Sequence, residues 1–157
     1  MAVRPIPEGY NTLTPYLAVE DAARAIEFYK DAFGAEETVR MPGPGGTIGH
    51  AELQIGDSKL MLSDAFPQST TRPPGELGGT TAGVFLYVED VDAMFKKATD
   101  TGASVTMALE DQFWGDRFGS LSDPFGHSWS IATHVEDVPP QEMAERAKQA
   151  MAAMSSS

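Results

Sequence analysis

The segment Leu17-Ala18-Val19-Glu20-Asp21 recurs 69 residues further along the chain as Leu86-Tyr87-Val88-Glu89-Asp90. Each copy joins the apolar end of a strand to an acidic pair that opens a helix, and each helix runs into Gly-Ala, at 34–35 and at 102–103. An internal repeat of this kind fixes the architecture of a chain. Two copies are too few for a solenoid, so the repeat indicates two duplicated modules related by a pseudo-twofold axis. A pocket on that axis would be lined by corresponding residues of both halves.

The first module, residues 11–64, is predicted to have the order β-α-β-β-β. Asp21 is placed to cap a helix with an apolar stripe at steps of four, three and four, formed by Ala22, Ile26, Tyr29 and Phe33. Alternation of polar and apolar residues and two Gly-containing turns divide the rest into strands. The expected strands are 11–19, 36–41, 48–55 and 59–63.

A connector rich in Pro, Gly and Thr, residues 65–82, separates this module from the second, residues 83–134. The second module repeats the plan, with a strand at 83–88, a helix from Val91 and three further strands. Those strands are expected at 104–109, 117–122 and 127–133. A C-terminal helix, 138–154, starts at a Pro-Pro pair, and its apolar stripe is expected to pack on the body or on a second subunit.

Composition excludes several classes of partner. The chain has 11 basic and 23 acidic residues, a formal net charge of −12, and no cysteine. Nucleic acid and anionic membranes are disfavoured because phosphate contacts need clustered Lys and Arg. Disulfides, thiolate nucleophiles and Cys-ligated metals are excluded. The N-terminal residues have no apolar signal-peptide core and no run is long enough to span a membrane, so we expect a soluble, cytoplasmic protein.

Sequence motifs in both modules resemble those of the vicinal oxygen chelate superfamily. They are Val-Glu-Asp at each helix start, IEFYKDAFGAE at 26–36, and DPFGHSWSIATH at 123–134. The superfamily includes glyoxalase I, extradiol dioxygenases, fosfomycin resistance enzymes and bleomycin-binding proteins, and the resemblance covers residues 11–134. The stretches 49–65 and 111–134 look most like the PhnB-like glyoxalase subgroup. The fold implied is α+β, with two tandem β-α-β-β-β modules forming a cup-shaped open barrel.

The resemblance also implies where a metal would be held. In metal-dependent members, His, Glu or Gln on the first and last strands of each module bind the ion, and these positions fall on Thr14, Met61, Gly83 and Ser130. The repeat offset of 69 links Thr14 with Gly83 and Met61 with Ser130. This set offers neither imidazole nor carboxylate. We therefore expect no metal at that site and no cofactor, which counts against the usual activities of the metal-dependent members.

His50 and Glu52 are the candidate catalytic pair. They share one face of a strand whose other face is apolar. They could act as a base and its orienting carboxylate, or as half of a displaced metal site. They could equally be polar residues lining a wet cup, because the position 69 residues after His50 is Gly119, which offers no partner.

An aromatic pair next to an arginine marks the mouth of the second half-cup. Phe113 and Trp114 could stack on a planar ligand while Arg117 pairs with an anionic group of that ligand. The same residues could instead form a hydrophobic plug with a surface arginine. Both interpretations remain open.

Strand alternation predicts the walls of the pocket, since side chains two apart share a face. The expected walls are Thr14, Tyr16, His50, Glu52, Met61, Ser63, Phe85, Ser128 and Ser130, with Trp114 at the rim. The opposite faces, such as Leu60 with Leu62 and Trp129 with Ile131, are apolar and should lie under the helices. A one-residue slip would exchange every wall residue for a core residue.

Two functions of different classes fit this pattern. One is a protein that binds a small planar or amphipathic molecule in the cup, similar to bleomycin resistance proteins. The other is a lyase- or isomerase-type enzyme using His50 as a base or a relocated metal site. A homodimer is expected, with modules paired within one chain or exchanged between two.

Overall fold

The first repeat folds around a capped helix. The computed structural model describes residues 2–157, and in it α1 (Ala22–Phe33) begins after Asp21, whose carboxylate accepts from the backbone N–H of Arg24 (3.1 Å). The helix ends at Gly34, whose φ of 67° lies in the left-handed region that favours glycine. The predicted stripe is the buried side of α1, and both the cap and the stripe are confirmed.

Sheet 1 carries this helix on one side. Its strands are β1 (Tyr16–Val19), β2 (Glu36–Pro42), β3 (Ile48–Ile55) and β4 (Ser58–Asp64), in the spatial order β1-β4-β3-β2. β1 is parallel to β4, and the other pairs are antiparallel. A short 3₁₀ turn, η1 (Pro44–Gly46), joins β2 to β3.

Sheet 2 repeats the arrangement after the connector, which contains one short helix, α2 (Pro74–Leu77). Its elements are β5 (Gly83–Tyr87), α3 (Val91–Thr101), β6 (Ser104–Asp111), β7 (Asp116–Ser122) and β8 (Ser128–His134), and its strand order is β5-β8-β7-β6. Tyr16 lies opposite Met61 in sheet 1, and Phe85 lies opposite Ser130 in sheet 2. Both pairs differ by the repeat offset, so the duplication extends to the register.

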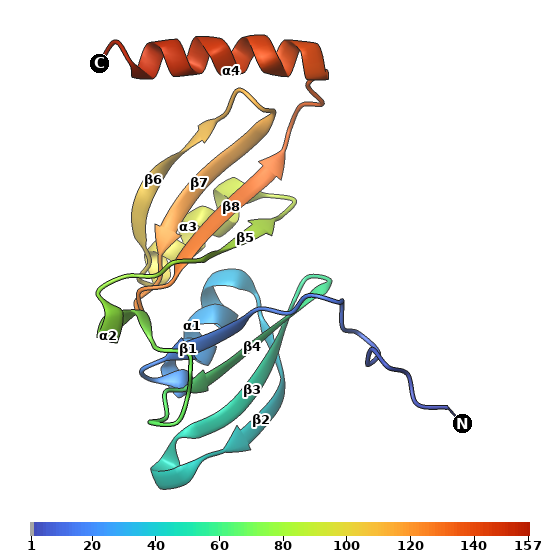
Figure 1. The fold of residues 1–157 in the computed structure, drawn as a ribbon, viewed down its shortest axis with the longest axis vertical. Helices are drawn as coiled ribbons and strands as arrows, with labels where there is room; N and C mark the ends of the chain where they lie inside the picture. The colour runs from blue at the N-terminus through green and yellow to red at the C-terminus, as the bar shows by residue number, and fades with distance from the viewer. Residues whose placement is uncertain (1) are drawn as a thin grey trace.

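The first strand is shorter than its sequence suggests. β1 starts at Tyr16 instead of residue 11, and the residues before it form an exposed N-terminal arm, 2–15 (Figure 1). Proline lacks an N–H, so Pro15 cannot donate to a strand ladder. Its carbonyl still accepts from the N–H of Met61 (2.9 Å). Thr14 therefore precedes the sheet instead of lying within it.

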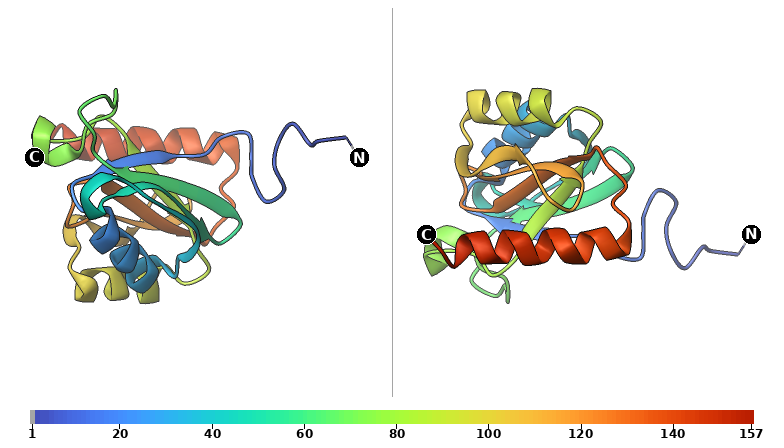
Figure 2. Two further views of the ribbon diagram at one scale, coloured as in Figure 1. Left: turned by 90° about the horizontal axis from the view of Figure 1, so that it is seen from below. Right: turned by 90° about the horizontal axis from the view of Figure 1, so that it is seen from above.

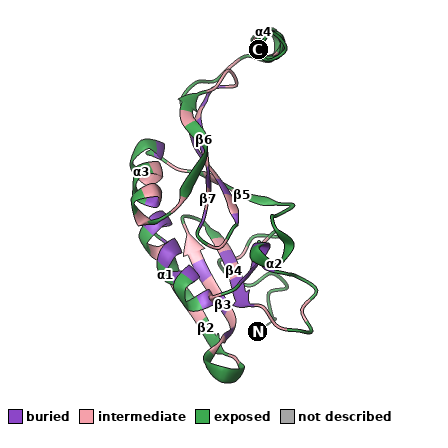
Figure 3. Ribbon diagram, turned by 90° about the vertical axis from the view of Figure 1, so that its left-hand side faces the viewer, coloured by how far each residue is buried: buried purple, intermediate pink, exposed green. Residues whose placement is uncertain are grey.

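The two sheets lie side by side and remain open. α1 and α3 pack against each other on one side of both sheets, whereas the opposite sides carry no long helix and only the connector with the short α2 lies beside β1 there (Figure 3). We call these opposite sides the open faces. The α+β architecture with two repeated modules is confirmed, but the two sheets of one chain do not close into a barrel.

One hydrophobic core runs through both modules. Trp129 of β8 packs against Phe33 and Tyr29 of α1, with ring centroids 4.4 Å and 5.1 Å apart. His127 follows the turn between β7 and β8 and is buried, and its Nε2 donates to the Ala18 carbonyl of β1 (2.8 Å). These contacts fix how the second module sits on the first.

The C-terminal helix α4 (Pro140–Met154) lies across the end of the second module (Figure 2). It has no buried residue, so its predicted packing on the body of its own chain is not found. Arg146 anchors it through Glu136 and the Phe113 carbonyl. No helix within residues 2–157 has the length and apolar character that crossing a bilayer requires.

Candidate ligand-binding site

The strand faces divide as alternation predicts. Leu60, Leu62 and Trp129 are buried under the helices, while Met61 and Ser130 lie on the open faces. Most of the predicted wall residues share these faces. In sheet 1 they are Tyr16, His50, Glu52, Met61 and Ser63, and in sheet 2 they are Phe85, Ser128 and Ser130.

A hydrogen-bonded chain of four side chains crosses the open face of sheet 1. Tyr16 Oη lies 3.0 Å from His50 Nδ1, and His50 Nε2 lies 2.9 Å from Glu52 Oε1. The hydroxyl of Tyr10, on the N-terminal arm, donates to Glu52 Oε2. We call these four residues the polar relay. It brings the predicted pair His50 and Glu52 into direct contact and extends it at both ends.

The tautomer of His50 follows from its partners. A carboxylate only accepts, so Nε2 carries the proton that bonds Glu52, and Nδ1 then accepts from the Tyr16 hydroxyl. The side chains of His50 and Glu52 are 23% and 13% exposed. Both side chains are buried enough to keep a fixed geometry and exposed enough to contact a ligand.

Sequence reasoning missed Tyr10. It comes from an irregular arm 42 residues before Glu52 in the chain, and no periodicity places it over the sheet. Pro5 and Pro7, which precede it, restrict this arm without indicating where it lies. Only the folded chain brings the two residues together.

The open face of sheet 2 is aromatic. Phe85 lies 5.0 Å from Tyr87 and 5.6 Å from Phe118 between ring centroids, Phe118 lies 5.7 Å from Trp114, and Trp114 lies 5.1 Å from Phe113. We call these five residues the aromatic wall. Phe85 and Tyr87 are 48% and 65% exposed, so the wall presents ring faces to solvent.

Two members of this wall, Tyr87 and Phe118, were not among the predicted site residues. The signal for Tyr87 was present, because it lies two residues after Phe85 on the same strand face. Phe118 lies opposite Ala132, which shares a face with the predicted Ser130. Extending the alternation by one more step on each strand would have found both.

Asp116 organises the polar end of the wall. This buried carboxylate accepts from Tyr87 Oη (2.8 Å), Trp114 Nε1 (2.9 Å) and His134 Nδ1 (2.8 Å). Burial alone would raise the pKa of Asp116, but hydrogen bonds from His134, Tyr87 and Trp114 hold it below its usual value. Asp116 therefore stays charged and fixes the orientation of two rings of the wall.

His134 joins this group to the chain that leads to α4. Its Nε2 lies 2.9 Å from the carboxylate of Asp137. The hydrogen bond with Asp116, followed by the one with Asp137, raises the pKa of His134. His134 is thus a structural link between two carboxylates.

Arg117 does not lie where the ligand hypothesis requires it. It points to the helix side of β7, where its guanidinium binds Asp92 of α3 (2.9 Å) and Asp111 (3.1 Å). Alternation explains the difference, because Asp116 and Phe118 on either side of it occupy the open face. The expected pairing of Arg117 with a ligand anion is therefore wrong for this structure.

The positions that hold metal in related proteins carry unsuitable groups. Thr14 and Ser130 supply hydroxyls and Met61 supplies a thioether, whereas Gly83 has no side chain that could bind a metal. Among residues 2–157, no three or more His, Cys, Asp or Glu side chains are grouped so that they could hold an ion. The residues present do not fit a divalent metal at this site.

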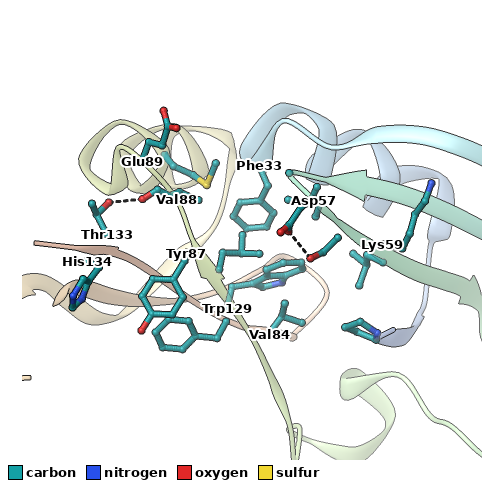
Figure 4. Close-up of a pocket in the computed structure, with 18 of the residues that line it drawn as sticks. Phe33, Asp57, Lys59, Val84, Tyr87, Val88, Glu89, Trp129, Thr133 and His134 are labelled. Carbon is teal, nitrogen blue, oxygen red and sulfur yellow. Dashed lines mark hydrogen bonds between the residues drawn. The ribbon is translucent and has the colours of Figure 1, made fainter. Parts of the chain in front are cut away.

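A cleft of about 930 Å³ lies between the modules. Phe33, Trp129, Leu86 and Met94 contribute to its apolar part, and Tyr87 and His134 lie at its edge (Figure 4). It opens beside β5, an edge strand of sheet 2. A smaller cleft of about 400 Å³ lies between β1, the connector and the start of β8, and Tyr16 and Ser128 of the open faces line it.

Comparisons with known proteins agree with this architecture. The chain is 50% identical over 129 residues to Mycobacterium tuberculosis protein Rv0887c, covering 80% of this chain and 76% of that protein. The crystal structure of TioX from Micromonospora sp. ML1 superposes with a TM-score of 0.64 at 31% identity, covering 80% and 99% of the two chains. The PhnB protein from Bacillus cereus has the same fold, with a TM-score of 0.60 at 20% identity over 78% and 99%.

The sequence model of one family spans most of both modules. The glyoxalase/bleomycin resistance protein/dioxygenase superfamily matches residues 10–131, from the tyrosine of the N-terminal arm to the middle of β8. With its repeated modules, its strand register and this match, the chain belongs to that superfamily.

Proposed function

We propose that this protein binds a small planar or amphipathic molecule on its open faces. The observation that carries the proposal is the aromatic wall, where rings of Phe85 and Tyr87 stay exposed on a folded chain. Contiguous exposed apolar surface usually marks a binding site. Phe85 packs against Phe118, and Trp114 is fixed by its hydrogen bond to Asp116. Rings whose orientation is fixed in this way suit a flat apolar ligand.

We further propose that a second copy of the chain completes the site. One chain leaves much of both open faces exposed and turned to the same side, so a twofold axis can bring sheet 1 of one copy against sheet 2 of the other. The polar relay would then face the aromatic wall across one pocket. α4, which buries nothing on its own chain, is available to the same interface.

Light scattering tests the dimer directly. The mass of one chain is 16.8 kDa, and we expect a species of twice that mass at micromolar concentration. A single-chain mass at high concentration would contradict the dimer. Titration of a planar aromatic probe into each form would then show whether binding requires the pair.

Substitutions in the wall test the ligand site. Phe85→Ala and Phe118→Ala should each weaken binding of a planar probe by about tenfold or more, since each loses a stacking ring. Leu77→Ala is a matched control, because Leu77 is an exposed apolar residue of α2 outside the wall. Equal affinity of all three variants would contradict a site on sheet 2.

An enzyme that uses His50 as a general base is the second candidate. The contact between His50 Nε2 and Glu52 is the observation that favours it, since an oriented imidazole beside a carboxylate is suited to proton transfer. Recovery of a captured ligand unchanged supports binding alone. Conversion of that ligand, stopped by His50→Ala, would favour the enzyme.

The proposed setting is the cytoplasm, with neither nucleic acid nor membrane as a partner. A net charge of −12 repels phosphate-rich surfaces and supports this assignment. A fractionation experiment that finds the protein in the membrane pellet would contradict it.

A further inference from the structure

The polar relay presents hydrogen-bond acceptors toward the open side of sheet 1. The proton of His50 Nε2 is held by Glu52, and the proton of the Tyr16 hydroxyl is held by His50 Nδ1. The Tyr16 oxygen therefore offers lone pairs outward, as does the carboxylate of Glu52. With this pattern of protons, neither group has a donor to spare for a ligand.

Tyr10 shows that a donor can reach Glu52 from the open side. Its hydroxyl approaches from the N-terminal arm, which is not part of the sheet, and bonds Glu52 Oε2. An ionised carboxylate has about four acceptor sites, of which the relay uses two. A donor from a bound molecule can use the remaining sites or replace the Tyr10 hydroxyl.

No strong cation of the chain neutralises Glu52. Among the described residues, its only ion-pair partner is His50. Lys59 lies on the same face, but its ammonium donates to Thr38 Oγ1 (3.2 Å) and lies 5.4 Å from the centre of the Tyr10 ring. Glu52 is therefore a half-buried carboxylate whose charge is balanced by hydrogen bonds alone.

The aromatic wall favours the same kind of ligand. The faces of Phe85 and Tyr87 carry the negative side of the ring quadrupole, which attracts cations. A flat cation would stack on the wall while its N–H groups donate to the relay. An anion would meet acceptors on one side and ring faces on the other.

We propose that the ligand is a planar cation with N–H donors, of the aminated polycyclic aromatic class, and that Glu52 is its counter-charge. This inference rests on the proposed binding function and on closure of the pocket by a second copy. It assigns Glu52 and Tyr16 to ligand recognition through their acceptor atoms.

Two probes of equal size and opposite charge test it on the full-length protein. Proflavine is a three-ring cation with two amino groups, and anthracene-2-carboxylate is a three-ring anion. We expect calorimetric titration to give at least tenfold tighter binding of proflavine. Glu52→Gln should remove most of that preference, and Tyr16→Phe should weaken proflavine without affecting the anion.

Glu27→Gln is the matched control, because it removes the same charge from an exposed position on α1, on the helix side of sheet 1. An equal loss in Glu27→Gln and Glu52→Gln would assign the preference to overall charge and overturn the role of Glu52. Equal binding of the two probes would overturn the cation inference and leave the binding function standing. If neither probe binds the folded dimer, the proposed function itself fails.

Discussion

At the scale of single residues, one buried carboxylate joins the two modules. Asp123 accepts from Tyr29 Oη (2.6 Å), Trp129 Nε1 (2.9 Å) and the backbone N–H groups of Phe125 and His127. Tyr29 comes from α1, and the other donors come from the second module. Burial and the nearby charge of Asp123 raise the pKa of Tyr29, so its hydroxyl remains a donor at any physiological pH.

Tyr29→Phe removes the only side-chain donor that reaches Asp123 from the first module. Because the bond is buried and its acceptor is charged, we expect a loss of about 1.5–3 kcal/mol in the free energy of unfolding. Urea denaturation measures the change. Tyr87→Phe is the control, since Tyr87 is exposed and water can replace its bond to Asp116. An equal loss in both variants would contradict the special role of Asp123.

His134 predicts a pH dependence. The hydrogen bonds with Asp116 and Asp137 raise its pKa above the ordinary value of 6.5 in the folded protein. The resulting stabilisation is fully present below 6.5 and is lost as the pH rises through the folded-state pKa. The difference in Tm between wild type and His134→Ala should therefore be larger at about pH 5.5 than at about pH 9.

Calorimetric scans at the two pH values provide this measurement. Asp137→Asn keeps one of the two carboxylate charges beside His134 and should show an intermediate difference. A difference that grows with rising pH would show that the sign is wrong and that His134 is not held as an imidazolium.

At the scale of elements, the first residues of α1 and α3 hydrogen-bond to equivalent positions on the last strand of each module. Asp64 of β4 accepts from the N–H of Ala22 in α1 (2.9 Å) and from that of Ile48 (2.7 Å). Thr133 of β8, 69 residues later, accepts from the N–H of Val91 in α3 (2.9 Å). The repeat therefore preserves a strand-to-helix bond while changing the side chain that makes it.

Asp64→Ala should destabilise the protein more than Thr133→Val. The first leaves two buried backbone donors unpaired, at about 1–3 kcal/mol each. The second leaves one backbone donor unpaired, that of Val91, and frees the half-buried Val88 carbonyl, to which the Thr133 hydroxyl donates (2.8 Å). Urea midpoints of the two variants measure the difference. A larger loss in Thr133→Val would contradict the assignment of Asp64 to both donors.

Periodicity predicted the helices and strands well, but it predicted the ends of strands and their pairing partners less well. α1 and its cap follow from Asp21 and from apolar residues that recur at helical spacing, both of which are local signals. β1 was predicted too long because the alternation continues through residues that have no strand partner. Strand pairing beyond a hairpin depends on distant residues, which a local pattern does not contain.

The candidate site also contains residues that a local pattern predicts and residues that it does not. His50, Glu52 and Phe85 were found because a strand fixes the face of every second residue. Tyr10 was missed because it lies on the N-terminal arm, where the chain leaves regular structure. Arg117 was grouped with the aromatic pair beside it in the sequence, although it belongs to β7 and alternation puts it on the helix side of that strand. Their positions depend on Glu52 and Asp92, partners far away in the sequence.

At the scale of the whole molecule, the shared core predicts cooperative unfolding. Trp129 of β8 packs its ring against Tyr29 and Phe33 of α1, so neither module retains its core when the other unfolds. We expect one transition in urea by circular dichroism and by tryptophan fluorescence. Trp129→Ala should cost about 3–5 kcal/mol and separate the unfolding of the two modules into two transitions. Two transitions in the wild-type protein would contradict the shared core.

The absence of a metal at the family's site remains a prediction for the whole protein. Elemental analysis of protein purified without a histidine tag should find no stoichiometric Zn, Ni, Fe or Mn. Thr14, Met61, Gly83 and Ser130 give the physical reason, since none supplies imidazole or carboxylate. One equivalent of metal that is lost in His50→Ala would show that a site exists elsewhere on the open face.

The duplicated halves are equivalent in register and different in chemistry. Tyr16 corresponds to Phe85, His50 to Gly119 and Met61 to Ser130. If both walls of a twofold pocket were the same, a guest could enter in either of two flipped poses of equal energy. In the proposed dimer pocket the two walls differ, so that degeneracy would be lifted and an asymmetric ligand would be held in a single pose. The divergence of the repeats would thus let a pocket built from equivalent strands distinguish one end of its ligand from the other.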